Sequence, residues 1–219
     1  MWGDTNFAGV FDIYRRNDMI ADFREKYLHP YIKLYSFADL LKKMCIEILG
    51  LHPDQCYGTN DDKNTLTNYK WEDMVTKVTK DEYRLSIKNS PETFKTSDMT
   101  AREVLQYVGT NIFRRMNDNI WADATIRLIN QEDTELAIIT DCRFPNEVDV
   151  VQKAGGKVIK FTRNPYPNDN HISETALDKD KYDWEKFDYV LDNKDMSINK
   201  QNEALYNILR EWNYVPNIT

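Results

Sequence analysis

A short apolar run that ends in a polar cluster constrains this chain more than any other stretch. The run, residues 135–140, is rich in β-branched residues and predicts a buried strand. The polar segment 141–147 follows at once, and its Pro145 suits the first position of a helix. Open α/β sheets bind ligands at the carboxyl ends of their strands, so Asp141 and Arg143 are expected to enter a crevice there.

A second strand is expected after one helix. Residues 148–154 have the apolar spacing of a helix, Gly155 and Gly156 supply its C-cap, and residues 157–162 alternate like a strand. This segment is therefore predicted to be a β-α-β unit with parallel strands and a right-handed crossover.

Helix and strand patterns alternate over much of the rest of the chain. Further helices are predicted at 20–27, 38–49, 100–108, from 119 toward the key strand, and at 200–212, and further strands at 31–36 and 187–191. Ser97 or Asp98 is expected to cap the helix at 100–108, and Gly109 to end it. The alternation predicts an α/β fold with a doubly wound, mainly parallel sheet.

Two segments interrupt this alternation. Residues 52–98 are rich in polar and turn-forming residues, which predicts a surface insertion rather than core. Residues 163–175 hold two prolines and three asparagines near their start, which predicts a loop that carries Arg163 and His171. The length of 219 residues suits a single domain, 1–219, with these two segments inside it.

Composition excludes some classes of protein. The net charge of −7, without a long basic run, argues against direct nucleic-acid binding and against a membrane-surface protein. Three cysteines without metal-ligand spacing, and no long apolar stretch, indicate a reducing, cytoplasmic setting. Cys142 is interpreted as a small packed residue rather than a nucleophile.

Several candidate residues have a structural interpretation as well as a functional one. Trp121 suits a core position, or it stacks on a nucleotide base. Asp39 lies near the start of a predicted helix, so helix capping is favoured over a substrate contact. His171 stands alone without metal-ligand spacing, and no metal site is predicted.

Several motifs together carry a resemblance to the phage-type deoxynucleoside monophosphate kinases. The most specific are D-x-R-F-P-N-E at 141–147 and H-x-S-E-T-A-L-D at 171–178. The others, in the same order and spacing as in that family, are residues 37–42, 105–110, 121, 154–159 and 188–193. The resemblance covers roughly residues 20 to 212.

The resemblance implies a fold and an activity. It implies a three-layer α/β fold like that of P-loop nucleoside monophosphate kinases, and transfer of the γ-phosphoryl group of ATP, with Mg²⁺, to a deoxynucleoside monophosphate. It implies catalytic roles for Asp141 and for Arg163, which resembles a lid arginine. The substrate-binding residues it implies are Arg102, Gln106, Trp121, Asp141, Arg143, Glu147 and His171.

One departure from the family pattern concerns the ATP site. Kinases of this family begin with a strand and a phosphate-binding loop of the form GxxxxGK[DST], which aligns here with residues 11–19. That segment contains neither glycine nor lysine, and Arg15 and Arg16 supply charge without the backbone cradle. Without that loop, ATP and Mg²⁺ are expected only if the chain is active.

Three hypotheses follow. The chain is a kinase with an unusual donor site, a catalytically inactive nucleotide-binding or regulatory protein, or a structural protein that uses the fold alone. A homodimer is compatible with each, and a viral chain would act in the host cytoplasm.

Overall fold

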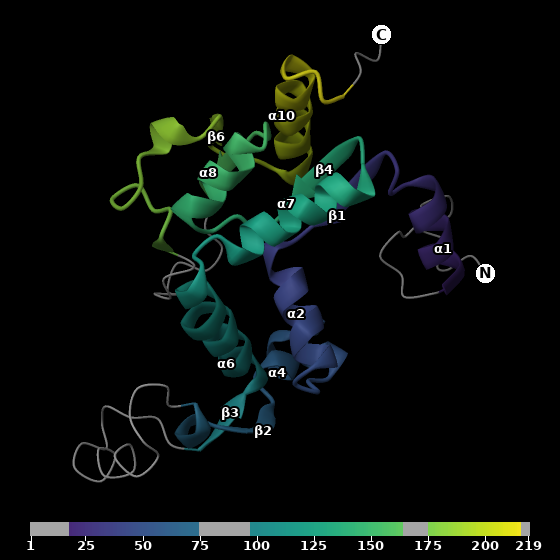
Figure 1. The fold of residues 1–219 in the computed structure, drawn as a ribbon. Helices are drawn as coiled ribbons and strands as arrows, with labels where there is room; N and C mark the ends of the chain where they lie inside the picture. Colours follow the sequence, from purple (N-terminus) through teal and green to yellow (C-terminus); the bar gives the residue numbers. More distant parts are fainter. Residues whose placement is uncertain (1–17, 75–96, 164–174, 216–219) are drawn as a thin grey trace. The chain divides into compact units, whose positions relative to one another are not determined.

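The computed structural model describes residues 18–74, 97–163 and 175–215, which combine helices with short strands (Figure 1). They divide into two compact units. The first comprises Met1–Ser36 and Ile126–Thr219, and the second comprises Phe37–Thr125. The prediction of a mixed α/β protein is therefore confirmed, whereas residues 1–17 and 164–174, with Arg15, Arg16 and His171, lie outside the described residues.

The first unit contains two pairs of parallel strands. Its elements are α1 (Asp18–Tyr27), β1 (Ile32–Tyr35), β4 (Leu136–Ile139), α8 (Pro145–Lys153), β5 (Ile159–Phe161), η5 (Trp184–Lys186), β6 (Tyr189–Leu191) and α10 (Ile198–Glu211). Strand β1 pairs with β4, and β5 pairs with β6 (Figure 1). Helix α7 (Ile120–Glu132) begins in the second unit and ends in the first.

The expected parallel pairing across α8 is not observed. Strands β4 and β5 flank α8 as the sequence predicts, but each is hydrogen-bonded to a strand more distant in the sequence. In the described residues the strands thus form separate two-stranded sheets instead of one continuous sheet. Strand β4 is also only half-buried along its whole length. The apolar pattern predicted where the strands lie, but it carries no information on which strands become neighbours.

Helix α8 has the boundaries that its end residues predict. Pro145 occupies the first turn, where its missing N–H is not needed, and the helix ends at Lys153. Gly155 follows with φ of +87°, a conformation that favours glycine. A Cβ atom on Gly156 would lie 2.8 Å from Cγ1 of Val151, so this glycine allows close packing onto the helix.

The second unit is built around a small apolar core. Its elements are α2 (Phe37–Glu47), α3 (Pro53–Tyr57), α4 (Asn60–Lys63), β2 (Leu66–Lys70), η2 (Trp71–Asp73), β3 (Asp98–Thr100), α6 (Ala101–Gln106) and the π-helix η4 (Tyr107–Arg114). Strands β2 and β3 pair antiparallel. The buried core consists of Cys45, Leu51, Cys56, Met99, Ala101, Val104 and Val108.

The helix predicted at 100–108 begins where the sequence indicates, but its capping residue and its end differ from the prediction. Thr100 caps α6, because its side chain accepts a hydrogen bond from the backbone N–H of Glu103 at 3.2 Å, and Asp98 belongs to β3. Gly109 does not end the helix, which continues as η4. A Cβ atom on Gly109 would lie 2.6 Å from Cδ2 of Leu41, so the glycine serves close packing here.

The described part of the range 52–98 contains helices and a strand and contributes to the core. The range contains α3, α4, β2 and η2, and Cys56 in α3 is fully buried. The expectation of surface rather than core is wrong for this residue. Periodicity is weak here because the helices are too short to show a repeat.

Candidate functional site

The predicted site residues fall on both units. Arg102, Gln106 and Trp121 belong to the second unit. Asp141, Arg143, Glu147 and Arg163 belong to the first, and His171 lies outside the described residues.

Asp141 lies at the carboxyl ends of two neighbouring parallel strands. Ser36 directly follows β1 and Asp141 follows β4 by two residues. The Ser36 hydroxyl donates a hydrogen bond of 2.6 Å to Oδ2 of Asp141, with both groups partly buried. The site expected from the strand pattern therefore has a fixed carboxylate at the sheet edge where α/β proteins bind ligands.

Glu147 holds the loop after β4 in place. Its side chain is only 2% exposed, and Oε2 accepts hydrogen bonds from the backbone N–H groups of Arg143 at 2.7 Å and Phe144 at 3.0 Å. A buried carboxylate that receives two backbone donors at a helix start is well satisfied. This geometry gives Glu147 a role in positioning the loop.

The same loop carries one exposed arginine and one inert thiol. Arg143 is exposed, while its backbone is fixed by Glu147. Burial, with a smaller contribution from the carboxylates of Glu147 and Asp141, raises the pKa of Cys142 to about 12. The thiol stays protonated near neutral pH, which agrees with the interpretation of Cys142 as a packed residue.

Arg102 and Gln106 lie one turn apart on α6. The Arg102 guanidinium donates from Nε to Oδ1 of Asn64 at 3.2 Å and from one terminal nitrogen to Oδ1 of Asn60 at 2.9 Å. Both acceptors are neutral amides, so these contacts orient the guanidinium without neutralising its charge. Gln106 is exposed.

Trp121 lies in the interior. It is 8% exposed, its Nε1 donates to the carbonyl oxygen of Gly109 at 3.1 Å, and its ring centroid lies 5.2 Å from that of Phe113. The described structure thus places Trp121 in the core position that was one of its two interpretations. A buried indole with a satisfied N–H is a structural element of this unit.

Arg163 is attached to the segment after β6. Its backbone N–H donates to Oδ1 of Asn193 at 2.8 Å, and its guanidinium donates to the carbonyl oxygens of Lys194 and Met196. Its side chain is exposed. These contacts hold the start of the predicted lid-like loop, and the remainder of that loop lies outside the described residues.

Two lysines near Arg102 were not predicted from the sequence. The pKa of Lys63 is lowered by burial and then by the positive charges of Lys42 and Arg102, so each of these two cations lies within electrostatic reach of Lys63. They come from α2, α4 and α6. No motif signals such a cluster, because its members are far apart in the sequence.

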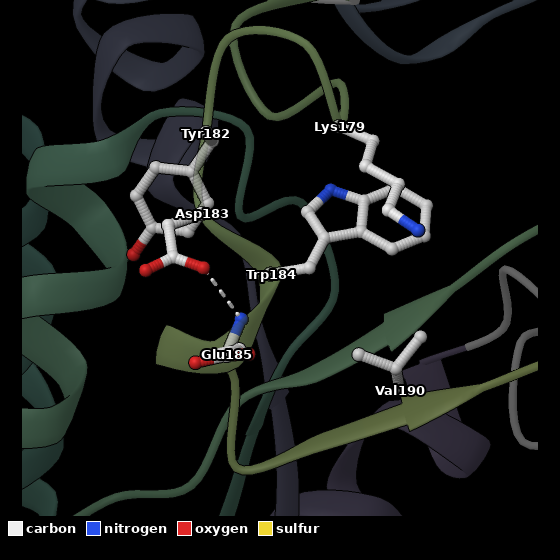
Figure 2. A pocket seen from close by; sticks show the side chains of 6 residues that line it. All are labelled: Lys179, Tyr182, Asp183, Trp184, Glu185 and Val190. Carbon is white, nitrogen blue, oxygen red and sulfur yellow. Dashed lines mark hydrogen bonds between the residues drawn. The ribbon is translucent and has the colours of Figure 1, made fainter.

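A separate pocket lies in the first unit (Figure 2). Its volume is about 550 Å³, and it is lined by Lys179, Tyr182, Asp183, Trp184, Glu185 and Val190. The Trp184 ring has the ammonium groups of Lys160 and Lys179 at 5.5 and 5.8 Å from its centroid. Of the predicted site residues that the structure describes, none lines this pocket, and its two carboxylates are unfavourable for a phosphate.

No three His, Cys, Asp or Glu side chains of residues 18–74, 97–163 and 175–215 are grouped so that they could hold a metal ion. Over the same part of the chain, none of the helices has the length and apolar character needed to cross a membrane.

Together these features define a mixed α/β protein with a carboxylate and an arginine at the ends of parallel strands. More specifically, the chain belongs to the deoxynucleotide monophosphate kinase family, whose model matches residues 31–203. It is 30% identical over 184 residues to the "Putative deoxynucleotide monophosphate kinase" of Acanthamoeba polyphaga mimivirus, covering 78% of this chain and 77% of that protein. It is also 36% identical over 56 residues to the "Deoxynucleoside-5'-monophosphate kinase" of Escherichia phage T5, covering 25% of this chain and 22% of that protein.

Proposed function

We propose that this chain binds a deoxynucleoside monophosphate and transfers to it the γ-phosphoryl group of ATP. Family membership supports this function. The observation that carries it is the Asp141 carboxylate, which is fixed at the ends of the paired strands β1 and β4. It lies on a loop in which buried Glu147 accepts a hydrogen bond from the backbone N–H of Arg143. Phosphoryl transfer depends on positioning and on electrostatic stabilisation, and this loop offers both.

Each candidate residue has a role that suits its chemistry. Arg143 in the first unit and Arg102 in the second are each assigned a phosphate contact, because guanidinium groups bind phosphate in a bidentate geometry. Asp141 orients the acceptor, and Arg163 stabilises charge on the transferred group. Gln106, Trp121, Glu147 and His171 complete the acceptor site; Trp121 and Glu147 act through the segments that they hold.

The proposal includes a fold and a setting. The chain would be a single domain of the P-loop nucleoside monophosphate kinase type. It would have a three-layer α/β fold, an insertion at 52–98 and a lid-like loop at 163–175. It would act in the cytoplasm, of the host if the chain is viral, without binding nucleic acid directly and with a homodimer as one assembly. ATP with Mg²⁺ would supply the phosphoryl group, and no described residue is assigned to either.

A second candidate function is a catalytically inactive protein that binds the monophosphate and has a regulatory role. It is favoured by the sequence of residues 11–19, which contains no glycine and no lysine where the family has its phosphate-binding loop. Loss of preorganised backbone donors typically costs several kcal/mol of transition-state stabilisation, on the order of 3 kcal/mol for one donor.

A coupled assay of diphosphate formation from ATP and each deoxynucleoside monophosphate distinguishes these functions. The kinase proposal expects turnover that Arg163→Ala abolishes. Turnover that survives the Arg15→Ala, Arg16→Ala double substitution would show that the ATP phosphates are held by other residues. Complete absence of turnover, with the monophosphate still bound, would favour the second candidate.

A further inference from the structure

The second unit brings three cationic side chains together from three helices. Lys42 lies on α2, Lys63 at the end of α4, and Arg102 on α6. Each is partly buried. The charges of Lys42 and Arg102 both act on Lys63. Burial raises the pKa of the Cys56 thiol, although the charges of Lys42 and Lys63 both act to lower it. Like charges held together in partly buried positions cost free energy, which favours a role that requires them.

Among the described residues neither Lys42 nor Lys63 forms an ion pair with a carboxylate within 4.0 Å. Asp39, on the same helix as Lys42, is hydrogen-bonded to the side chain of Tyr57. The Lys42 ammonium lies 4.7 Å from the centroid of the Tyr57 ring. Asp62, which precedes Lys63 in the sequence, accepts hydrogen bonds from the backbone N–H and the hydroxyl of Thr59 at 2.8 and 2.6 Å. Its charge attracts Lys63, but its hydrogen bonds are directed to the start of α4.

Hydrogen bonds from Arg102 hold α6 against α4. Asn60 and Asn64, which lie on either side of Lys63 in the sequence, both accept hydrogen bonds from Arg102. The turn before α4 is tight, because a Cβ atom on Gly58 would lie 2.4 Å from the carbonyl oxygen of Asp54. The hydrogen bonds of Arg102 therefore connect α6 to the segment that carries Lys63.

We infer that Lys42 and Lys63, together with Arg102, bind the dianionic phosphate of the deoxynucleoside monophosphate. This inference rests on the proposed function, which assigns a phosphate contact to Arg102 alone in this unit. A phosphate dianion would offset the repulsion among the three cations and accept hydrogen bonds from both ammonium groups. The role of the two lysines comes from the structure: Lys42 ends the segment 37–42 that carries part of the family resemblance, but no motif joins it to Lys63.

The test uses the full chain and the variants Lys42→Met, Lys63→Met and the double variant. Lys43→Met is the matched control, because Lys43 is an exposed neighbour on α2 outside the cluster. Calorimetry measures binding of each deoxynucleoside monophosphate and its deoxynucleoside, and thermal shift measures stabilisation by millimolar inorganic phosphate. We expect the double variant to bind the monophosphate about tenfold to a hundredfold more weakly, and the control to match the wild type. Thermal unfolding of each variant confirms that it is folded.

The outcomes separate this inference from the proposed function. Monophosphate binding that is unchanged in the double variant overturns the inference and leaves the proposed function intact. An equal loss of deoxynucleoside and monophosphate binding also overturns it, because the lysines would then not act on the phosphate. If no monophosphate binds to the wild type but inorganic phosphate does, and the double variant loses this effect, the anion site stands and the proposed function fails. If the wild type binds neither the monophosphate nor inorganic phosphate, both this inference and the proposed function are overturned.

Discussion

The hydroxyl of Ser36 donates a 2.6 Å hydrogen bond to the carboxylate of Asp141, although the two residues are 105 positions apart in the sequence. Because β1 and β4 are parallel, their carboxyl ends meet at the same edge, and the hydrogen bond connects the segments that follow them. We therefore expect Ser36→Ala to lower the free energy of unfolding by about 1 kcal/mol. We also expect it to weaken monophosphate binding, since the Asp141 carboxylate is then less well oriented.

Denaturant unfolding and calorimetry check this prediction. Ser36→Thr is the control, because it keeps the hydroxyl. If Ser36→Ala changes neither stability nor affinity, the hydrogen bond does not organise the site.

Trp121→Phe tests whether the indole is a structural element. The substitution keeps an aromatic ring but removes the N–H that satisfies the buried carbonyl of Gly109. We expect the free energy of unfolding to fall by about 1–3 kcal/mol, as for other buried groups left unpaired. Chemical denaturation measures this. A stable Trp121→Phe variant with weakened monophosphate binding would instead support stacking of Trp121 on the base.

Lys63→Met should stabilise the protein in the absence of ligand. Burial, followed by the charges of Lys42 and Arg102, lowers the pKa of Lys63, so the protonated amine is less favourable in the folded chain than in the unfolded chain. This penalty is present at neutral pH and disappears as the pH rises through the usual value of 10.5. After screening by solvent we expect Tm to rise by about 1 °C.

Differential scanning calorimetry at low ionic strength measures this shift, with Lys43→Met as the control. A lower Tm for Lys63→Met would mean that Lys63 makes a stabilising contact, and the cluster would then need no ligand to explain it.

Glu132 should stabilise the fold at neutral pH and lose this contribution in acid. Burial alone would raise the pKa of Glu132, but hydrogen bonds from Lys33 at 2.5 Å and Tyr35 at 2.7 Å outweigh it and lower the pKa below 4.5. A carboxyl with a lowered folded-state pKa stabilises the fold above its unfolded pKa, and that contribution is lost as the pH falls through the folded pKa. We expect Glu132→Gln to lose stability at neutral pH and to unfold with a shallower dependence below about pH 5.

Unfolding curves recorded from neutral to acidic pH test this expectation. Equal slopes for the wild type and Glu132→Gln below pH 4.5 would show that Glu132 titrates as it does in the unfolded chain.

The sequence predicted the elements of the first unit better than their arrangement. Strands β1, β4, β5 and β6 all lie inside the predicted ranges, because alternation and β-branched residues depend on local order alone. Their partners depend on long-range packing, and the expected pairing across α8 did not occur. Ile32 and Leu34 on β1 are each 43% exposed, although helices normally cover both faces of the sheet in a three-layer α/β fold.

Some residues of the candidate site could be predicted from the sequence, and others only from the structure. A strand end followed by Asp141 and Arg143 could be identified from the pattern, and the structure fixes Asp141 through Ser36. The buried, loop-holding role of Glu147 depends on hydrogen bonds to backbone groups, which no pattern of side chains shows. Lys42 and Lys63 could not be found at all, since only the packing of α2, α4 and α6 brings them near Arg102.

Calorimetric titration of the wild-type chain and of Arg143→Ala with each deoxynucleoside monophosphate is the decisive test of substrate binding by the loop after β4. Arg127→Ala is the control, because Arg127 is an exposed arginine on α7. We expect saturable binding of at least one monophosphate to the wild type and to the control, and binding weaker by about tenfold to a hundredfold for Arg143→Ala. Absence of binding to the wild type for every monophosphate, or equal affinity in Arg143→Ala, would contradict it.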